Sequence, residues 1–401
     1  MKKLILITLL LLSITPCLRA QRKEMSQARS YIKSGKELDK AEKMLRELLA
    51  KDSVNRQNPK IYLLLYDALR KQYEQGNEKL YLKQKYDTVA FFDLAKRIFG
   101  VLEALDSVDA APDRKGRINM VYRRQHAAVL DALRPNIYYG GTFHMRKHDY
   151  AKAYSFFSTY IDCKEQPIFS GYDYMTKDGR MTDAAYWATY CGNKMADAGK
   201  TLAYSDMVRH AGRKQKFVLR YIAEAYKQLN DTANYIETLH AGFEKYPEYP
   251  YFFPRLTDHY TQSGRLDSAL AVSDKALESD GRNALFLLAK SNTLLNMGRY
   301  DDCIVFSDSL IHVCDTIAEP YYNAGISYLN KALELEKVHK AKKDKAAARS
   351  LYKKAQGYLE DYRKRAPEEK GKWAQALYRI YFNLNLGRQF EEMDKILKNL
   401  K

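Results

Sequence analysis

The fold is decided by residues 216–317, a stretch that repeats itself three times. It reads KFVLRYIAEAYKQLNDTANYIETLHAGFEKYPEY (216–249), PYFFPRLTDHYTQSGRLDSALAVSDKALESDGRN (250–283) and ALFLLAKSNTLLNMGRYDDCIVFSDSLIHVCDTI (284–317). At a period of 34 residues the three copies, together with the start of a fourth at Ala318, form columns of matching positions. The columns hold Leu219, Phe253, Leu287 and Tyr321; Tyr226, Tyr260, Leu294 and Tyr328; Gly242, Ala276 and Leu310; and Gly264 and Gly298.

These columns predict stacked helical hairpins. Small residues are needed where two helices approach closely, and Gly264 and Gly298 are suited to a left-handed helix end. One hairpin cannot bury its own apolar face, so neighbouring hairpins must pack together. With few Pro and Gly residues and no long alternating runs, we expect an all-α protein, an α-solenoid of antiparallel helix hairpins. The alternative is a non-repetitive helical bundle.

The period also resembles the tetratricopeptide (TPR) repeat, a helix–turn–helix unit of about 34 residues. Tyr321, Ala324, Gly325 and Tyr328 look like the first half of its pattern. The A-x3-F pair and the closing proline are matched by Ala153 and Phe157, Ala41 and Leu45, Ala355 and Leu359, Pro247 and Pro367. The tryptophan of the pattern is absent, and Ser273 and Ser307 replace the second aromatic residue. The resemblance, to an exported bacterial TPR protein, implies a TPR-like superhelix.

The rest of the chain is arranged around this array. We expect irregular TPR-like hairpins at 21–134, divergent TPR repeats at 135–215 with a loop at 166–180, a regular array at 216–367 whose last hairpin is extended at 328–351, and a C-terminal hairpin at 368–401. The segment at 166–180 reads as a surface loop, which is either functional or a tolerated insertion.

The N-terminus has the features of a secretory signal peptide. Lys2 and Lys3 precede an apolar run over residues 4–12, and Arg19-Ala20 ends the segment. Cleavage after Ala20 predicts an exported protein of the periplasm or cell envelope, with no transmembrane segment in the mature chain. Pro16 argues against lipidation at Cys17.

The formal charge of +18 falls to +15 when Lys2, Lys3 and Arg19 are removed with the leader. For an exported chain this favours an anionic envelope polymer or lipid phosphate over nucleic acid as a partner, or simply a well-solvated surface. The other cysteines, Cys163, Cys191, Cys303 and Cys314, form no CxxC motif. We expect buried thiols, with a Cys163–Cys191 disulfide as the alternative.

No constellation of residues indicates catalysis. The sequence lacks GxSxG, HExxH and a glycine-rich phosphate loop. His144 and His148 stand four residues apart, but only Asp149 is near to complete a metal site. We therefore predict no enzyme activity, no cofactor and no metal.

The resemblance to TPR proteins implies that the first helices of the repeats line a concave binding face. The residues expected there are Phe217, Arg220, Glu224, Lys227, Gln228, Tyr251, Asp258, Thr261, Gln262, Asn292, Asn296, Tyr322 and Asn330. Asn292 and Asn296 match two positions of the family's clamp for a peptide carboxylate, but its basic positions hold Leu288, Glu319 and Asn323. We therefore expect no carboxylate clamp.

The function expected is a non-enzymatic envelope scaffold that mediates protein–protein interaction through this face, with another envelope protein or peptide segment as its partner. The alternative is a periplasmic or surface protein that binds a glycan or small ligand. The 33 tyrosines suggest a sugar-binding surface, and a resemblance to the glycan-binding exported TPR proteins of bacterial polysaccharide uptake systems implies a role in such a system. Many of these tyrosines fall on repeat packing positions, so packing is their first role.

Overall fold

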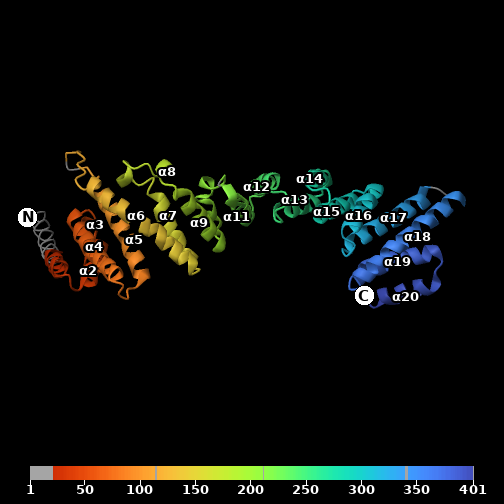
Figure 1. Cartoon of the computed structure of the whole chain (residues 1–401), viewed down its shortest axis with the longest axis horizontal. Helices are drawn as coiled ribbons and strands as arrows, with labels where there is room; N and C mark the ends of the chain where they lie inside the picture. The colour runs from red at the N-terminus through yellow and green to blue at the C-terminus, as the bar shows by residue number, and fades with distance from the viewer. Residues whose placement is uncertain (1–20, 113–114, 211, 339–341, 401) are drawn as a thin grey trace, which may run out of the picture. The chain divides into compact units, whose positions relative to one another are not determined.

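The computed structural model describes residues 21–112, 115–210, 212–338 and 342–400 (Figure 1). Throughout these ranges the regular structure is helical, and no strand occurs in them. The fold-class prediction, an all-α stack of antiparallel helix hairpins, is confirmed. No helix within the same ranges is both long enough and apolar enough to cross a bilayer. The predicted leader at 1–20, with Cys17, lies outside the described residues.

The chain divides into two compact units, one ending at Asn230 and one starting at Asp231. In the first unit a helix over residues 21–34 is followed by helices that pack against their neighbours along the chain. They are α2 Leu38–Lys51, α3 Ser53–Arg56, α4 Pro59–Tyr81, α5 Thr88–Asp109, α6 Arg123–Arg146, α7 Tyr150–Asp162, α8 Tyr174–Lys177, α9 Met181–Lys194, α10 Ala198–Leu202 and α11 Gln215–Gln228, with short 3-10 turns at Pro167–Phe169, Ser205–Met207 and Gly212–Lys214.

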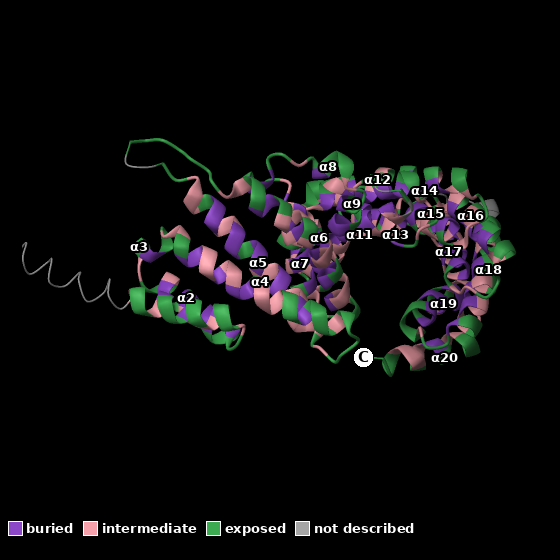
Figure 2. Ribbon diagram, turned by 60° about the vertical axis from the view of Figure 1, so that its left-hand side comes forward, coloured by how far each residue is buried: buried purple, intermediate pink, exposed green. Residues whose placement is uncertain are grey.

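In the second unit every helix packs against the next, and the first helices of successive hairpins, α13, α15, α17 and α19, also contact one another in a row. Figure 2 shows buried residues along the faces where consecutive helices meet. The helices are α12 Thr232–Lys245, α13 Phe252–Gln262, α14 Leu266–Ser279, α15 Ala284–Asn296, α16 Tyr300–Val313, α17 Glu319–Val338, α18 Lys342–Arg365, α19 Lys370–Leu384 and α20 Gly387–Lys398.

The boundary between the units falls inside the first copy of the repeat. Its two helices, α11 and α12, belong to different units. The apolar face of α11, with Val218 and Ile222, is part of the core of the first unit. In α12, Gly242 faces the ring of Phe252 in α13. The sequence period alone did not reveal this division, because the aligned columns continue through it.

The turns inside the hairpins follow the sequence prediction. Gly264 and Gly298 have φ values of +71° and +72°, in the left-handed region that glycine adopts without a steric penalty. Asn230, which occupies the same column in the first copy, has a φ of +56°. The predicted left-handed helix ends at Gly264 and Gly298 are therefore confirmed.

Close approach between helices explains the small residues of the repeat. A Cβ atom added to Gly325 of α17 would lie 2.6 Å from Cγ of Leu359 in α18, and one added to Gly141 would lie 2.7 Å from the ring of Phe157. Cβ atoms in proteins essentially never come within 3.0 Å of such a neighbouring atom. These positions are glycine because the partner side chain already fills the space where a methyl group would stand.

The α17–α18 hairpin is longer than its predecessors. α17 has 20 residues and α18 has 24, whereas α13 to α16 have 11 to 14 residues each. The residues inserted after Tyr328 are thus helical on both sides of 339–341. Their basic side chains at Lys345, Arg349 and Lys353 are exposed.

Two glycines of this hairpin give a matched pair of variants. Gly325→Ala should lower the free energy of unfolding by about 1–3 kcal/mol, because the added methyl overlaps Leu359. Gly357→Ala in the middle of α18 meets no atom within 4 Å and should raise it by about 0.5–1 kcal/mol. Urea denaturation followed by circular dichroism measures both. Equal effects of the two substitutions would contradict the packing described here.

Candidate functional site

A groove of about 530 Å³ runs along the first helices of the second unit. α13, α15 and α17 form its walls, and Lys372 at the start of α19 closes one end. Six of the residues expected on the concave face line it: Asp258, Thr261, Gln262, Asn292, Asn296 and Tyr322. They are brought together because the first helices stand side by side, so that residues 34 positions apart, such as Asp258 and Asn292, become neighbours across the groove.

Two other residues expected on this face lie elsewhere in the second unit. Tyr251 immediately precedes α13, is 6% exposed, and has the guanidinium carbon of Arg255 3.8 Å from its ring centre. Asn330 is half-buried further along α17 and does not line the groove. Tyr251 is therefore part of the packing between helices.

The remaining expected residues, Phe217, Arg220, Glu224, Lys227 and Gln228, lie on α11 in the first unit. Nε of Arg220 donates to Oε1 of Glu224 over 2.9 Å, and Nδ2 of Asn193 in α9 donates to Oε2 of the same carboxylate over 2.7 Å. Phe217 is partly buried against the core of the first unit, and Lys227 and Gln228 are exposed at the end of α11. The structure thus places the thirteen expected residues in two separate units.

The groove contains a fixed pair of asparagines that the sequence analysis did not identify as a pair. Asn323, which is 3% exposed, donates from Nδ2 to Oδ1 of Asn292 over 2.6 Å and to Oγ of Ser291 over 3.0 Å. Because the oxygen of Asn292 accepts this bond, its NH2 group remains to donate into the groove. In the sequence, Asn323 is a polar residue at a helix packing position. The sequence analysis noted only that it replaces a basic residue of the family's carboxylate clamp.

The groove carries charges of both signs. The carboxylates of Asp258 and Glu319 line it and are exposed. Nζ of Lys372 lies 3.1 Å from Oε2 of Glu369, and this hydrogen bond raises the pKa of the lysine. The repeat alignment did not place Lys372 on this face, because Lys372 follows the insertion in α17 and α18 and so leaves the 34-residue register. Apolar surface is provided by Leu288 and by Leu285, which is 41% exposed.

Aromatic packing supports one wall of the groove. The ring of Tyr322 lies 5.1 Å from that of Tyr362 in α18, measured between ring centres. A tyrosine hydroxyl is protonated at neutral pH and can donate a hydrogen bond, and burial raises the pKa of Tyr322 further above its ordinary value.

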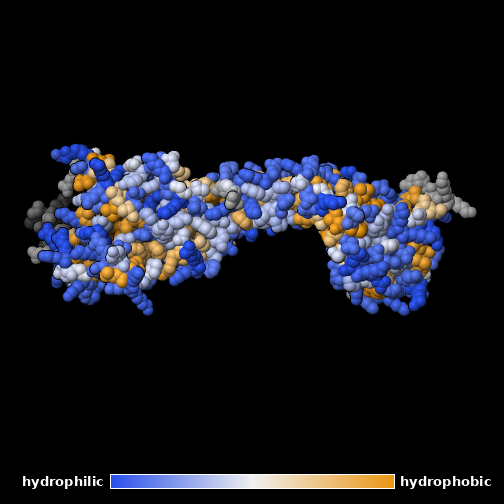
Figure 3. All heavy atoms as spheres, in the orientation of Figure 1, coloured by the Kyte–Doolittle hydropathy of each residue, from blue (hydrophilic) through white to orange (hydrophobic). Residues whose placement is uncertain are grey.

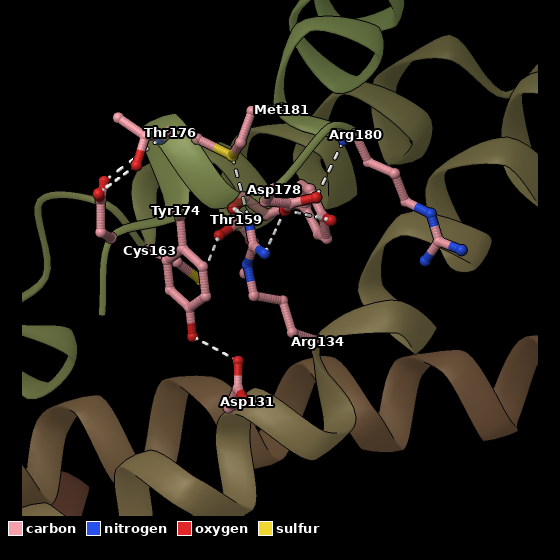
Figure 4. Close-up of polar contacts among 11 residues, drawn as sticks. Asp131, Arg134, Thr159, Cys163, Tyr174, Thr176, Asp178, Arg180 and Met181 are labelled. Atoms are coloured by element: carbon pink, nitrogen blue, oxygen red, sulfur yellow. Dashed lines mark hydrogen bonds and ion pairs between the residues drawn. The ribbon is translucent and has the colours of Figure 1, made fainter. Parts of the chain in front are cut away.

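The loop at 166–180 is held down by a buried arginine (Figure 4). Arg134 of α6 is 4% exposed, and its guanidinium carbon lies 3.7 Å and 3.8 Å from the ring centres of Tyr160 and Tyr174. Its Nη1 forms an ion pair with Asp178, and its Nη2 donates to the carbonyl oxygen of Tyr160 over 3.1 Å. The Tyr174 hydroxyl donates to Oδ1 of Asp131 over 2.8 Å.

This network makes the loop part of the first core. Ile168, Phe169 and Tyr174 are buried, so the expectation of a surface loop is wrong for these residues. The reason is that the loop brings its own aromatic side chains and an acid that matches Arg134. Burial would raise the pKa of Asp178, but hydrogen bonds from Tyr160 and from the Arg180 backbone, together with Arg134, lower it overall. The structure therefore assigns the loop a packing role.

The two spaced histidines do not form a common site. His144 is 2% exposed, with its ring stacked 5.4 Å from that of Phe156, measured between centres. His148 follows the helix in a left-handed conformation, with Nδ1 2.9 Å from the Tyr150 hydroxyl. Across the part of the chain that the structure describes, no group of three His, Cys, Asp or Glu side chains is placed to hold a metal ion. The four cysteines after Cys17 are free thiols.

No protein-family model matches the chain, and no curated protein matches it. Among solved structures it is similar to the C-terminal part of a TPR repeat-containing protein from Cytophaga hutchinsonii, at 10% identity and a TM-score of 0.44, covering 65% of this chain and 93% of that one. It is also similar to a TPR repeats protein from Bacteroides fragilis, at 19% identity and a TM-score of 0.32, covering 62% and 97%.

Human IFIT1, solved as a dimer with m7Gppp-AAAA, is similar at 11% identity and a TM-score of 0.36, covering 82% of this chain and 72% of that one. Likenesses at TM-scores below 0.5 define no shared ligand or partner. The architecture is defined by this chain's own sequence and structure. It has columns of matching residues at a 34-residue period and helix hairpins with left-handed turns, as in a TPR-type helical array.

The network around Arg134 predicts a large loss of stability when its cation is removed. Arg134→Met should lower the free energy of unfolding by about 3 kcal/mol at neutral pH, because it leaves Asp178 without its partner. Arg180→Met, an exposed neighbour, should change it by less than about 0.5 kcal/mol. Guanidinium titrations of both variants measure the difference.

The effect should also depend on pH. The folded pKa of Asp178 is below its ordinary value of 3.8, so the carboxylate contributes its stabilisation above 3.8 and loses it as the pH falls through the folded pKa. The difference in the free energy of unfolding between wild type and Arg134→Met should therefore become smaller in acid. A difference that becomes larger below pH 3.8 would contradict the stabilising role given to the Arg134–Asp178 ion pair.

Proposed function

We propose that the protein is a non-enzymatic scaffold of the cell envelope that binds an extended segment of a partner protein in the groove between α13, α15 and α17. The observation that carries this proposal is the Asn292–Asn323 hydrogen bond of 2.6 Å, which orients an amide donor into the groove beside Asn296. An oriented amide suits a ligand whose own polar groups recur at regular intervals, as they do along a peptide backbone.

The spacing of the two groove asparagines supports an extended peptide. Asn292 and Asn296 are four residues apart on α15, which corresponds to about 6 Å along a helix axis. An extended chain repeats its orientation every two residues, about 6.6 Å. Asn292 has its NH2 group to donate to a backbone carbonyl, and Asn296 can both donate to and accept from backbone amide groups. Two successive residues on the same side of an extended segment can therefore bond to the pair.

The size and lining of the groove agree with this ligand class. Its volume of about 530 Å³ falls within the range of roughly 300–1,000 Å³ that is usual for ligand sites. Leu285 and Leu288 offer apolar contact for one or two side chains of the segment, while Asp258 and Glu319 favour a segment that carries a basic residue. Lys372 already forms an ion pair with Glu369, so its ammonium group binds a free carboxylate of a ligand less strongly.

A glycan ligand is less well supported by the positions of the tyrosines. Many of them are core residues, including Tyr62, Tyr160, Tyr174, Tyr186, Tyr221, Tyr251, Tyr260, Tyr321, Tyr352, Tyr362 and Tyr381. Tyr322 is the tyrosine that lines the groove within the described residues. The abundance that suggested a sugar-binding surface is thus largely accounted for by helix packing.

The groove variant expected to be most informative is Asn292→Ala with Asn296→Ala. Peptides selected from a displayed random library on the intact chain should bind about ten-fold or more weakly to this double variant, because two oriented amides are lost. Fluorescence anisotropy with a labelled peptide measures the affinity. Asn399→Ala, an exposed asparagine after α20, is the matched control and should change nothing. Selected peptides that bind the double variant as well as wild type would overturn the proposal.

Export is the second part of the proposal and is supported by residues 1–20. The protein recovered from envelope fractions of the producing cell should begin at Gln21 when its N-terminus is sequenced. Leu9→Arg with Leu10→Arg should leave an uncleaved chain in the cytoplasm, because the apolar run is interrupted. Ser13→Ala should be processed normally. An N-terminus at Met1 in the envelope fraction, or at a lipid-modified Cys17, would contradict this part.

A further inference from the structure

The connector between α5 and α6 presents three apolar side chains to solvent within four residues. Ile118 is 60% exposed, Met120 is 43% exposed and Val121 is 64% exposed. In Figures 1 and 2 the described residues of the connector extend beyond the ends of the two helices that it joins. Figure 3 shows a mainly hydrophilic surface that apolar areas interrupt. Single exposed apolar residues are common on protein surfaces. Three of them on one projecting segment do not pack in the core and point to another role.

The base of this connector is firmly held. Arg123 at the start of α6 donates from Nε and Nη2 to the two carboxylate oxygens of Asp106, each over 2.7 Å, and Asp106 is 5% exposed. The backbone N–H of Tyr122 donates to Oδ2 of Asp109 over 3.0 Å. These bonds tie the connector to the last turn of α5. The three apolar side chains are thus presented on a segment whose C-terminal leg is fixed.

The apolar residues are accompanied by positive charge. Residues 115–124 include Lys115, Arg117, Arg123 and Arg124, and they contain no acidic residue. Arg123 forms an ion pair with Asp106. The side chains of Lys115, Arg117 and Arg124 are exposed to solvent. The segment therefore combines an apolar tip with a basic surround.

We infer that residues 115–124 are a contact site for an anionic lipid surface. At such a surface the basic side chains lie near lipid phosphates, and the apolar side chains enter the boundary between headgroups and acyl chains. A projecting apolar segment with basic neighbours complements a flat anionic interface. A single short segment gives weak, reversible binding to the membrane through the first unit. The groove of the second unit is not needed for this contact and stays available to bind a partner. This inference does not depend on the groove.

The test is co-sedimentation of the chain beginning at Gln21 with vesicles of phosphatidylglycerol and phosphatidylcholine, and with vesicles of phosphatidylcholine alone. This chain retains every described helix and lacks the apolar leader, which would itself partition into lipid. Binding is expected to the anionic vesicles, to weaken as salt is added, and to be much weaker for the neutral vesicles.

Two variants separate the apolar and the charged contributions. Ile118→Ser with Met120→Ser and Val121→Ser should reduce partitioning about ten-fold, because three apolar contacts are removed. Lys115→Gln with Arg117→Gln should reduce it roughly five-fold for each charge removed. Ile118, Met120 and Val121 are exposed, so the unfolding midpoint of the triple-serine variant should match wild type. The midpoint of the charge variant is measured in the same way.

Matched controls remove the same kinds of side chain elsewhere. Val54→Ser with Leu82→Ser takes away exposed apolar residues, and Lys353→Gln with Lys354→Gln takes away exposed charges on α18; both should bind vesicles as wild type does. Loss in the connector variants alone supports the inference. It is overturned if wild type does not sediment with anionic vesicles, if the triple-serine variant binds them unchanged, or if the α18 variant loses as much binding as the connector variant.

Discussion

The structure depends on one packing constraint: each helix hairpin has an apolar face that only a neighbouring hairpin can cover. Close approach of the helices is possible where one partner has no side chain, as at Gly242 against Phe252 and at Gly325 against Leu359. The left-handed turns at Gly264 and Gly298 then return the chain at the right point for the next helix to pack. Repetition of these features every 34 residues produces the stack in the second unit.

The groove is a direct consequence of this stacking. First helices that stand side by side bring equivalent positions of successive repeats together, so a pattern spread along the chain becomes a polar surface lined by Asp258, Asn292 and Asn296. What distinguishes this surface is the buried Asn323, which holds one asparagine in a fixed orientation. The proposed binding function needs no reactive group, because it relies on the arrangement of hydrogen-bond donors, acceptors and apolar side chains along the first helices.

Two irregular segments of the first unit illustrate how differently insertions can be used. The loop at 166–180 turns its aromatic residues inward, and Arg134 between Tyr160 and Tyr174 makes it part of the core. The connector before α6 is tied down at its base by Arg123 and Asp106, yet it leaves its apolar residues in solvent. Each segment is held by a partly buried ion pair, but only the loop at 166–180 buries its apolar side chains in the core.

The sequence by itself determined the all-α class, the hairpin turns at Gly264 and Gly298 and six of the residues that line the groove. Periodic apolar burial and glycine conformation are local properties of the chain, and the repeat period relates equivalent positions of successive helices. The division of the chain after Asn230, the placement of Lys372 at the groove and the Asn292–Asn323 bond were decided only by the tertiary structure. The insertion in α17 and α18 breaks the register that would have aligned Lys372 with the repeat. Tyr174 is buried because the fold places Arg134 against its ring, whereas Val121 is left in solvent. These contacts join residues outside the repeat, so the 34-residue pattern does not predict them.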